Sequence, residues 1–359
     1  MTQVIQAEPL EGLCRDIFIA AGAPVDIAAI VAESLVHSNL FGHDSHGVLR
    51  VKQYVTMIRD GMIQPDQRPR IRKRFGATAM VTGGYGFGQV GARYAAELAT
   101  EIGAEQGIGA VSLGQSTHVG RLGEYTAIIA AKGLIGIGFT SGTMYSGWVT
   151  PYGGRERTFG TNPMSFAVPG GDGGTLLLDF ATSGIAHGKI LLARAKGAPL
   201  PIGMMLDKDG RPTTDAGILD DGAVLLAMGA HKGSGLSLIM EIIPTLLAGH
   251  RPISSPEFHF GNPTLLIALS PEAFDEGTDF PRHVDALKRR VKAVKPAEGF
   301  AEVLLPGEPE ARSYAERVKS GIPLPEAVWA DLYELADEFG VCVLTPDALS
   351  SGRRRRAIQ

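Results

Sequence analysis

Cysteine, an excess of positive charge and long apolar runs are all scarce in this sequence. Only Cys14 and Cys342 occur among the 359 residues, which excludes a fold built on several disulfide bridges. Basic residues number 34 and acidic residues 38, a net charge of −4, which argues against a nucleic-acid partner. No apolar run approaches the roughly 18 residues that a membrane span requires. The first ten residues lack the basic-then-apolar order of a signal peptide, so we expect a cytoplasmic protein without a membrane partner.

The rest of the composition is that of a globular protein rich in glycine. Hydrophobic residues make up 44% and charged residues 20%, enough apolar surface to bury a core, which excludes a disordered chain. Glycine occurs 47 times, about twice its usual share, which predicts many turns. At about 150 residues per domain, the length predicts two domains.

Apolar periodicity differs between the ends of the chain and its middle. Helical spacing predicts helices from Pro24 onward and over residues 47–57. It also predicts helices near the C-terminal end, over residues 280–295, 310–319 and 325–339. Short apolar runs predict strands over residues 79–82, 108–113, 134–140, 164–168, 175–179 and 264–269. Helices are expected between some of them, over residues 92–106, 122–131 and 235–247. The middle is therefore expected to be an α/β domain flanked by helical ends.

Gly86, Gly88 and Gly91 match the G-x-G-x-x-G pattern between a strand-like run and a helix, as in a Rossmann fingerprint. The next strand-like run, however, ends at Gly114 without the acidic residue that would hold a ribose hydroxyl. A glycine-rich turn before a helix is the favoured interpretation, and a phosphate-binding loop is the alternative.

Polar chemistry is concentrated between His43 and Gly47. Histidine exchanges protons near neutral pH, and a helix that included His46 would carry Arg50 and Tyr54 along the same face. An arginine fork binds a carboxylate through two parallel hydrogen bonds. The pattern predicts a proton donor, a carboxylate clamp and a phenol at one pocket, whereas helix capping by Asp44 or Ser45 is the competing interpretation.

Two other interpretations of the same histidines are possible. His43 and His46 could hold zinc together with His37 or His118, but their spacing matches no recognised zinc helix. A Ser45–His46 hydrolase is disfavoured because adjacent side chains on a helix point about 100° apart. We therefore expect no metal site.

Three further segments end in residues suited to ligands. His118 and Arg121 stand at a strand-to-helix junction, where free N–H groups attract anions, and a histidine that only caps the turn is the competing interpretation. The run Leu178-Asp-Phe-Ala-Thr-Ser183 ends a strand with polar groups. The loop Gly229-Ala-His-Lys-Gly-Ser-Gly235 leads into an apolar helix and suits a phosphate without matching a P-loop.

Together these segments resemble the malate/L-lactate dehydrogenase family that lacks a Rossmann fold. The matching stretches follow the family's order over nearly the whole chain: Gly42-His-Asp-Ser-His-Gly47 with Arg50 and Tyr54, His118-Val-Gly-Arg-Leu-Gly123, Phe159-Gly-Thr-Asn-Pro163, Leu178-Asp-Phe-Ala-Thr-Ser183, His231-Lys-Gly-Ser-Gly235 and Pro306-Gly-Glu308. The resemblance is nearest to the family's hydroxycarboxylate dehydrogenase (hydroxyphenylpyruvate reductase) branch.

The resemblance implies a mixed α/β (α+β) fold. A non-Rossmann NAD(P)-binding domain with a largely antiparallel sheet would span residues 76–280. A helical domain would be formed by both chain ends, residues 1–75 and 281–359. The family also implies a homodimer with the active site near the interface.

Site residues are implied in the same way. His46 matches the family's proton donor, Ser45 supports it, and His118 is a second candidate for proton exchange. Arg50 matches the carboxylate clamp, and Tyr54 and His118 line the substrate pocket. Residues implied for the cofactor are His46, Gly120, Arg121, Leu122, Leu178, Asp179, Phe180, Ala181, Thr182, His231, Lys232, Gly307, Glu308, Pro309 and Glu310.

The resemblance therefore implies an oxidoreductase that moves a hydride between NAD or NADP and C2 of a small 2-hydroxy or 2-oxo acid. A cyclic imino-acid reductase is one alternative, although Lys189 stands where that branch carries an acidic residue. A relative that binds nucleotide without catalysis is the other.

Overall fold

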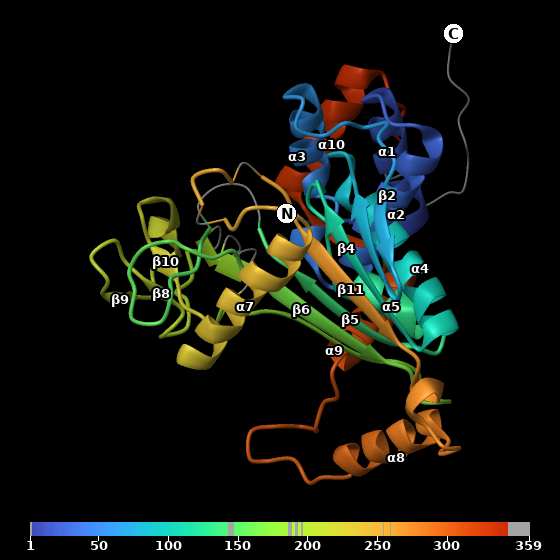
Figure 1. Ribbon diagram of the computed structural model, residues 1–359. Coiled ribbons are helices and arrows are strands. Elements are labelled where there is room, and N and C mark those ends of the chain that lie inside the picture. Colours follow the sequence, from blue (N-terminus) through green and yellow to red (C-terminus); the bar gives the residue numbers. More distant parts are fainter. Residues whose placement is uncertain are drawn as a thin grey trace. The chain divides into compact units, whose positions relative to one another are not determined.

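The computed structural model describes residues 2–343 except 143–146, 186–188, 191–192, 195–196, 254 and 259 (Figure 1). Its internal contacts define two compact units. The first, the helical unit, combines described residues up to Gln67 with those from Glu308 onward. The second, the sheet unit, spans Arg68–Gly307, so residues 281–307 belong to it. No helix among the described residues has both the length and the apolar character to cross a membrane.

The helical unit is formed by both chain ends. Its helices are α1 (Ala7–Ala20), α2 (Val25–Leu40), α3 (Arg50–Arg59), α9 (Glu308–Ser320) and α10 (Glu326–Phe339), with a short 3-10 helix at Asp44–His46. Strand β1 (Thr2–Ile5) pairs antiparallel with β12 (Ile322–Pro325), which ties the two ends together. Apolar side chains of α1 and α2, such as Phe18 and Leu35, are fully buried in this unit.

The sheet unit contains a seven-stranded sheet in the order β2-β3-β4-β11-β5-β6-β7. The strands are β2 (Arg70–Phe75), β3 (Thr78–Thr82), β4 (Ile108–Gly114), β5 (Ile135–Thr140), β6 (Pro163–Val168), β7 (Leu176–Ala181) and β11 (Thr264–Leu269). Neighbours are antiparallel throughout the sheet except for β3 and β4. The largely antiparallel, non-Rossmann sheet is therefore confirmed.

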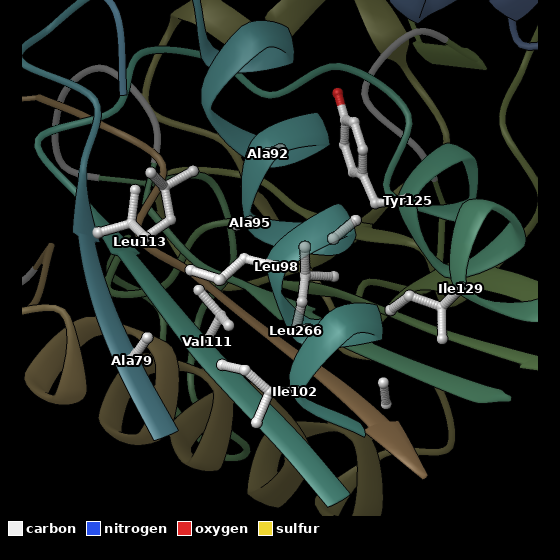
Figure 2. Close-up of a cluster of buried hydrophobic side chains, with 14 of the residues drawn as sticks. Ala79, Ala92, Ala95, Leu98, Ile102, Val111, Leu113, Tyr125, Ile129 and Leu266 are labelled. Atoms are coloured by element: carbon white, nitrogen blue, oxygen red, sulfur yellow. The ribbon is translucent and has the colours of Figure 1, made fainter. Parts of the chain in front are cut away.

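Helices α4 (Gly88–Gln106) and α5 (Gly123–Ala130) pack on this sheet through a cluster of buried side chains (Figure 2). Helix α4 contributes several alanines, and the facing strand β4 contributes Val111 and Leu113. Small side chains let the helix approach closely: a Cβ at Gly109 would lie 2.2 Å from the carbonyl oxygen of Ala99. The distance explains why strand β4 carries glycine at that position.

The remaining elements of the sheet unit are smaller. Strands β8 (Met205–Leu206), β9 (Pro212–Thr213) and β10 (Val224–Leu225) form a three-stranded sheet in the order β10-β8-β9. Short 3-10 helices lie at Ala216–Asp220 and Pro271–Phe274, and the longer helices are α7 (His231–Leu247) and α8 (Phe280–Lys292). Helix α8 contacts the loop around Gly173, because Lys288 donates hydrogen bonds to the carbonyls of Gly173 and Gly174.

The G-x-G-x-x-G motif lies in a β3-turn-α4-β4 segment, where β3 and β4 are parallel. Its central glycine serves packing: a Cβ at Gly88 would lie 2.3 Å from the carbonyl oxygen of His118 and 2.4 Å from that of Thr117. The favoured interpretation of a glycine-rich turn before a helix agrees with this geometry, since the sheet around it is not a Rossmann sheet.

Candidate functional site

In the helical unit, the turn from His43 to Gly47 carries the first group of candidate residues. Helix α2 ends at Leu40, the chain reverses at Gly42, and the 3-10 helix Asp44–His46 follows. Helix α3 begins only at Arg50. The expectation that one helix carries His46, Arg50 and Tyr54 along a single face is therefore wrong, because the chain changes direction between His46 and Arg50.

Ser45 and His46 are hydrogen bonded to each other. The hydroxyl oxygen of Ser45 lies 3.0 Å from Nδ1 of His46. The expectation that these adjacent side chains cannot meet is therefore wrong: although Ser45 and His46 follow one another in a 3-10 helix, their side chains turn toward each other and the hydroxyl reaches the ring nitrogen. The bond holds one ring nitrogen of His46 and so restricts how the imidazole can turn.

Arg50 is anchored to the same turn. Its Nε donates a hydrogen bond to the carbonyl oxygen of Ser45 at 2.8 Å, and its Nη1 donates to Oε1 of Gln53 at 2.7 Å. Its Nη2 has no hydrogen-bond partner in the described part of the chain. Burial lowers the pKa of Arg50 and nearby Tyr54 raises it, yet a guanidinium stays charged at neutral pH. Arg50 is therefore a charged group held in a fixed position, and the N–H donors of its Nη2 remain available. Such a group is suited to binding a carboxylate.

Tyr54 lies in the interior of the helical unit. Its side chain is buried, and its ring centroid is 6.4 Å from that of Phe18. The structure thus places the ring of Tyr54 in the packing beneath α3.

An ion pair from the other end of the chain supports the turn. Arg317 on α9 reaches both carboxylate oxygens of Asp44, at 2.6 Å and 3.2 Å, and also donates to the carbonyl oxygen of Asn39. The side-chain amide of Asn39 donates to Asp44 at 2.7 Å, and its oxygen accepts from the N–H of Val48 at 2.8 Å. Neither Asp44 nor Ser45 caps a helix, so the capping interpretation is wrong. Sequence reasoning missed Arg317, because it lies more than 270 residues from its partner.

Gly47 is required by the same arrangement. A Cβ at this position would lie 2.1 Å from Oδ1 of the buried Asn39, far closer than van der Waals contact allows. The glycine that closes the motif therefore makes room for Asn39, which in turn holds Asp44.

Metal binding has no support from the described residues. His43 lies 3.8 Å from a carboxylate oxygen of Glu310, a carboxylate that the sequence associated with the cofactor. No group of three histidine, cysteine, aspartate or glutamate side chains gathers in the part of the chain that the structure describes.

In the sheet unit, the segment from Gln115 to Gly120 carries His118. Thr117 donates to the carbonyl oxygen of Gly86 and accepts from the N–H of Gly88. Asn262 fastens the other side, because its N–H donates to the carbonyl oxygen of Ser116 and its Oδ1 accepts from Val119. Hydrogen bonds between uncharged side chains and the main chain, together with one main-chain bond, therefore set the path of this segment.

His250 holds the beginning of that segment. Its Nε2 accepts the N–H of Gln115 at 2.6 Å, so the proton of the neutral ring resides on Nδ1. Burial lowers the pKa of His250, which favours the neutral ring that this bond requires. Gln115 has a φ of 47°, a strained conformation for a residue with a side chain.

The segment after His118 leads into α5. Arg121 is buried, and Gly120 has a φ of 77°. The carboxylate of Asp179 on β7 accepts the N–H of Gly123, the first residue of α5, at 2.7 Å. A Cβ at Gly123 would lie 2.7 Å from that carboxylate, so glycine is needed where the helix meets β7.

Beyond β7, the chain joins a buried polar network on α7. The hydroxyl of Thr182 bonds the carbonyl oxygens of Thr161 and Asn162 and the hydroxyl of Ser237. Glu241 accepts from the side chain of Asn162 at 3.2 Å and from the N–H of Ile253 at 3.1 Å. Burial raises the pKa of Glu241, and these hydrogen bonds lower it in part. Sequence reasoning missed Glu241; its signal was one acidic residue in the middle of the apolar run that follows the first turn of α7.

Helix α7 begins with two exposed basic side chains. His231 and Lys232 are both exposed at its first turn, and the ring of His231 lies 5.8 Å from that of Tyr152. Gly229 and Ala230 both have positive φ, and a Cβ at Gly233 would lie 1.9 Å from the carbonyl oxygen of Met228. The tight turn ends at a helix N-terminus with two basic side chains, a combination that fits a phosphate.

The remaining residues associated with the cofactor are distributed over both units. In the sheet unit, Gly307 has a φ of 88°, and its Cβ position lies 3.0 Å from the carbonyl oxygen of Leu177 on β7. The first residues of α9, Glu308 to Glu310, belong to the helical unit. The structure brings together Ser45, His46 and Arg50 in the helical unit, and Gly123 with Asp179 in the sheet unit.

Known proteins share both the sequence and the fold of this chain. The family pattern described as malate/L-lactate dehydrogenase matches residues 5–333. The L-sulfolactate dehydrogenase of Methanocaldococcus jannaschii is 35% identical over 94% of this chain and 98% of its own length. Hydroxycarboxylate dehydrogenase B of Escherichia coli is 35% identical over 93% of this chain and 94% of its own. The crystal structure of malate dehydrogenase from Entamoeba histolytica, 26% identical, superposes with a TM-score of 0.90 over 95% of this chain and 99% of that one.

Fold and sequence together define a dehydrogenase of hydroxy acids. The chain belongs to the malate/L-lactate dehydrogenase family, as the motifs predicted.

Proposed function

We propose that this protein is an NAD- or NADP-dependent oxidoreductase that interconverts a small 2-hydroxy acid and its 2-oxo acid. The observation that carries the proposal is the tethering of Ser45, His46 and Arg50 within one turn. The turn supplies a proton-exchanging ring and a carboxylate-binding fork, the two groups that a 2-hydroxy acid requires. The named relatives act on malate, sulfolactate and hydroxycarboxylates, which supports a substrate of this class.

Each residue of the turn has a distinct task in this proposal. Arg50 binds the substrate carboxylate through the donors of Nη2, because Nε and Nη1 are already engaged. His46 exchanges the proton of the C2 oxygen, with its ring oriented by Ser45. His118 is the second residue proposed for proton exchange, and Tyr54 supports the pocket from beneath α3.

Residues of the chain also fit a nicotinamide cofactor. The cofactor supplies the hydride acceptor or donor, which no amino-acid side chain provides. His231 and Lys232 at the N-terminus of α7 offer cationic and N–H groups suited to its phosphates. Gly120, Arg121 and Leu122, the main chain of residues 178–182, His46, and residues 307–310 complete the set proposed for it.

The proposal also covers the oligomeric state and the location of the protein. We propose that the protein works as a homodimer, and that it works in the cytoplasm, where two unpaired cysteines are stable.

The first test is the loss of reduced-nicotinamide absorbance, with NADH and NADPH supplied separately. The panel holds pyruvate, oxaloacetate, phenylpyruvate, sulfopyruvate and a cyclic imino acid. We expect turnover of at least one 2-oxo acid and a preference for one cofactor. Cofactor binding without turnover of any oxo acid, or turnover of the imino acid alone, contradicts the proposal.

Variants of the turn separate its tasks. His46→Ala should lower kcat by about 10²- to 10⁴-fold, the usual contribution of a general acid or base. Arg50→Ala should instead raise KM for the oxo acid about 10- to 100-fold and leave the Kd of the reduced cofactor unchanged. Lys52→Ala on the same helix is the matched control, because Lys52 forms surface pairs with Asp331 and Glu334. An unchanged KM in Arg50→Ala would refute the carboxylate clamp.

A further inference from the structure

Helix α7 carries polar side chains on its buried side. The helix lies against the seven-stranded sheet, where it contacts β4, β5 and β11 (Figure 1). Ser237, Glu241 and Thr245 follow one another at intervals of four residues, and all three are buried. Residues four apart share one face of a helix, so these side chains point into the sheet unit. The serine and the threonine find hydroxyl partners there, but Glu241 brings a carboxylate into the interior.

The carboxylate of Glu241 has no cation beside it among the described residues. Burial raises the pKa of Glu241, and this shift is opposed by hydrogen bonds from the N–H of Ile253, the side chain of Asn162 and the main chain of Gly160. A buried carboxylate without a cation is strongly destabilising, and an apolar side chain of similar size often gives a more stable protein. Stability alone therefore does not account for a glutamate at this position.

The two oxygens of Glu241 join two segments that are far apart in the sequence. Oε1 accepts a hydrogen bond from Nδ2 of Asn162 at 3.2 Å, and Oε2 accepts one from the N–H of Ile253 at 3.1 Å. Both oxygens act as acceptors, which is the role of an ionised carboxylate. A side-chain amide has only one oxygen. Asn162 could not compensate by turning its own oxygen toward such an amide, because its Nδ2 also donates to the carbonyl oxygen of Ser237 at 3.0 Å.

The segment around Asn162 holds the end of β7. The N–H of Thr182 donates to the carbonyl oxygen of Thr161 at 3.0 Å, and its hydroxyl donates to the carbonyl oxygen of Asn162 at 3.0 Å. Asn162 has a φ of 39°, which residues with a side chain rarely adopt, so its contacts must hold it in place. Thr182 belongs to residues 178–182, which we call the cofactor segment. Glu241 therefore acts on the cofactor segment through Asn162.

The segment around Ile253 holds residues 115–120, which we call the His118 turn. His250, three residues before Ile253, accepts a main-chain N–H at the start of that turn at 2.6 Å. Asn262, nine residues after Ile253, bonds the main chain of the same turn at two points. Glu241 therefore acts on the His118 turn through Ile253.

We propose that Glu241 is a positioning residue, a single carboxylate that fixes the cofactor segment and the His118 turn relative to each other. The inference rests on the proposed function, since it takes both segments as parts of one active site. Glu241 contacts neither the acid nor the cofactor in this proposal, and it acts only through Asn162 and Ile253. Hydride transfer requires the cofactor and the proton-exchanging group in a fixed geometry, so a small displacement of either segment lowers the rate.

The test compares Glu241→Met with Thr245→Val. Methionine keeps the length of the side chain but has no acceptor oxygens, so both segments lose their bond to α7. We expect kcat to fall and the Kd of the reduced cofactor to rise, each by about 3- to 30-fold, the range for residues that act through others. The KM for the 2-oxo acid should change by less than about 2-fold, because Arg50 makes its contacts in the helical unit.

Thr245→Val is the matched control. It removes a buried hydroxyl from the same side of the same helix, and with it the bond to Ser141, but it leaves both bonds of Glu241 in place. Glu241→Gln is the conservative variant. It keeps one acceptor oxygen, so its kcat and cofactor Kd should lie between those of the wild type and of Glu241→Met. If Glu241→Met does not fold, Glu241→Gln carries the same comparison with Thr245→Val.

A measurement without cofactor or acid separates this inference from the proposed function. Hydrogen–deuterium exchange of the cofactor-free protein should be faster in residues 115–120 and 178–182 of Glu241→Met than in the same residues of Thr245→Val. This result stands whether or not the protein reduces an oxo acid in the absorbance assay. If Glu241→Met changed kcat, cofactor Kd and exchange no more than Thr245→Val does, Glu241 would only stabilise the fold and the inference would be overturned.

Discussion

The turns that carry His46 and His118 are held in opposite ways. Around His46, side chains hold the turn: Arg317, from a distant segment, forms an ion pair with Asp44, and the nearby Asn39 bonds both Asp44 and the main chain at Val48. Around His118, neutral groups and the main chain do the work, with Gly88 pressed directly beneath the carbonyl oxygen of His118. An added carbon at Gly47 in the first turn would overlap the side chain of Asn39, whereas an added carbon at Gly88 would overlap main-chain carbonyl oxygens of the second turn.

This difference has a physical basis. Ionic side chains are long and reach across gaps, so the His46 turn tolerates small shifts of its main chain. Close main-chain packing cannot adjust in this way. An overlap at 2.3 Å between a Cβ at Gly88 and the carbonyl oxygen of His118 can be relieved only by moving the main chain. The two turns should therefore respond differently to salt, to pH and to substitution.

The largest effect is expected from Gly88→Ala. Its Cβ would overlap two carbonyl oxygens of the His118 turn, so the turn or helix α4 must shift. We expect unfolding stability to fall by about 3 kcal/mol or more, together with most of the turnover, as measured by urea denaturation and kcat. Gly12→Ala in α1 is the control, because nothing lies within 4 Å of its Cβ position, and it should be neutral or stabilising. If Gly88→Ala and Gly12→Ala had the same free energy of unfolding and the same kcat, the His118 turn would not be tightly packed.

A smaller effect is expected from Arg317→Ala, which removes the ion pair of the His46 turn. The pair is partly exposed, so its loss should cost about 1–2 kcal/mol, between the values of surface and buried pairs. We expect kcat to fall about 10-fold, the Kd of the reduced cofactor to stay unchanged, and Arg317→Lys to restore part of the loss.

The control for that variant lies on the same helix. Lys319 is exposed in the last turn of α9, and Lys319→Ala should leave kcat unchanged. Added salt should also lower the stability of the wild type more than that of Arg317→Ala, because salt screens the pair. A drop in kcat that is equal in both alanine variants would indicate a general effect on α9.

The smallest effect is a pH dependence from the His118 turn. The pKa of His250 is lowered from its ordinary value near 6.5 in the folded protein, so the unfolded chain binds the proton first. The contribution of His250 to stability is therefore fully present above pH 6.5 and is lost as the pH falls toward the lowered pKa. Gln115 then loses the acceptor of its N–H.

Measuring the free energy of unfolding between pH 5 and 8 tests this dependence. We expect the wild type to lose stability below pH 6.5 and His250→Ala, already less stable at pH 8, to show a flatter profile. If the free energy of unfolding fell with pH to the same extent in the wild type and in His250→Ala, His250 would not be the cause of the pH dependence.

Most of the architecture was predictable from local patterns. Apolar periodicity located the strands β3 to β7 and β11 and the helices α2 to α5 and α7 to α10 within a few residues. Helix α1 was missed although Leu10, Leu13, Cys14, Ile17 and Phe18 follow helical spacing. Strands β1, β8, β9, β10 and β12 were missed because each has only two to four residues, too few for a pattern to show. Strand β2 was missed because all of its residues are exposed, so no apolar alternation marks it.

The sequence by itself determined the family, the mixed fold with its helical ends and the motif around His46, because each depends on residues that are close together in the chain. Only the tertiary structure decided how those residues are held. The bonds of Arg317 with Asp44 and of His250 with Gln115 join segments more than 130 residues apart. The exposure of Ile242 and Leu246 on α7 depends on which side of that helix the sheet unit covers. Sequence periodicity reports that a helix has two faces, but the network around Glu241 decides which of them is buried.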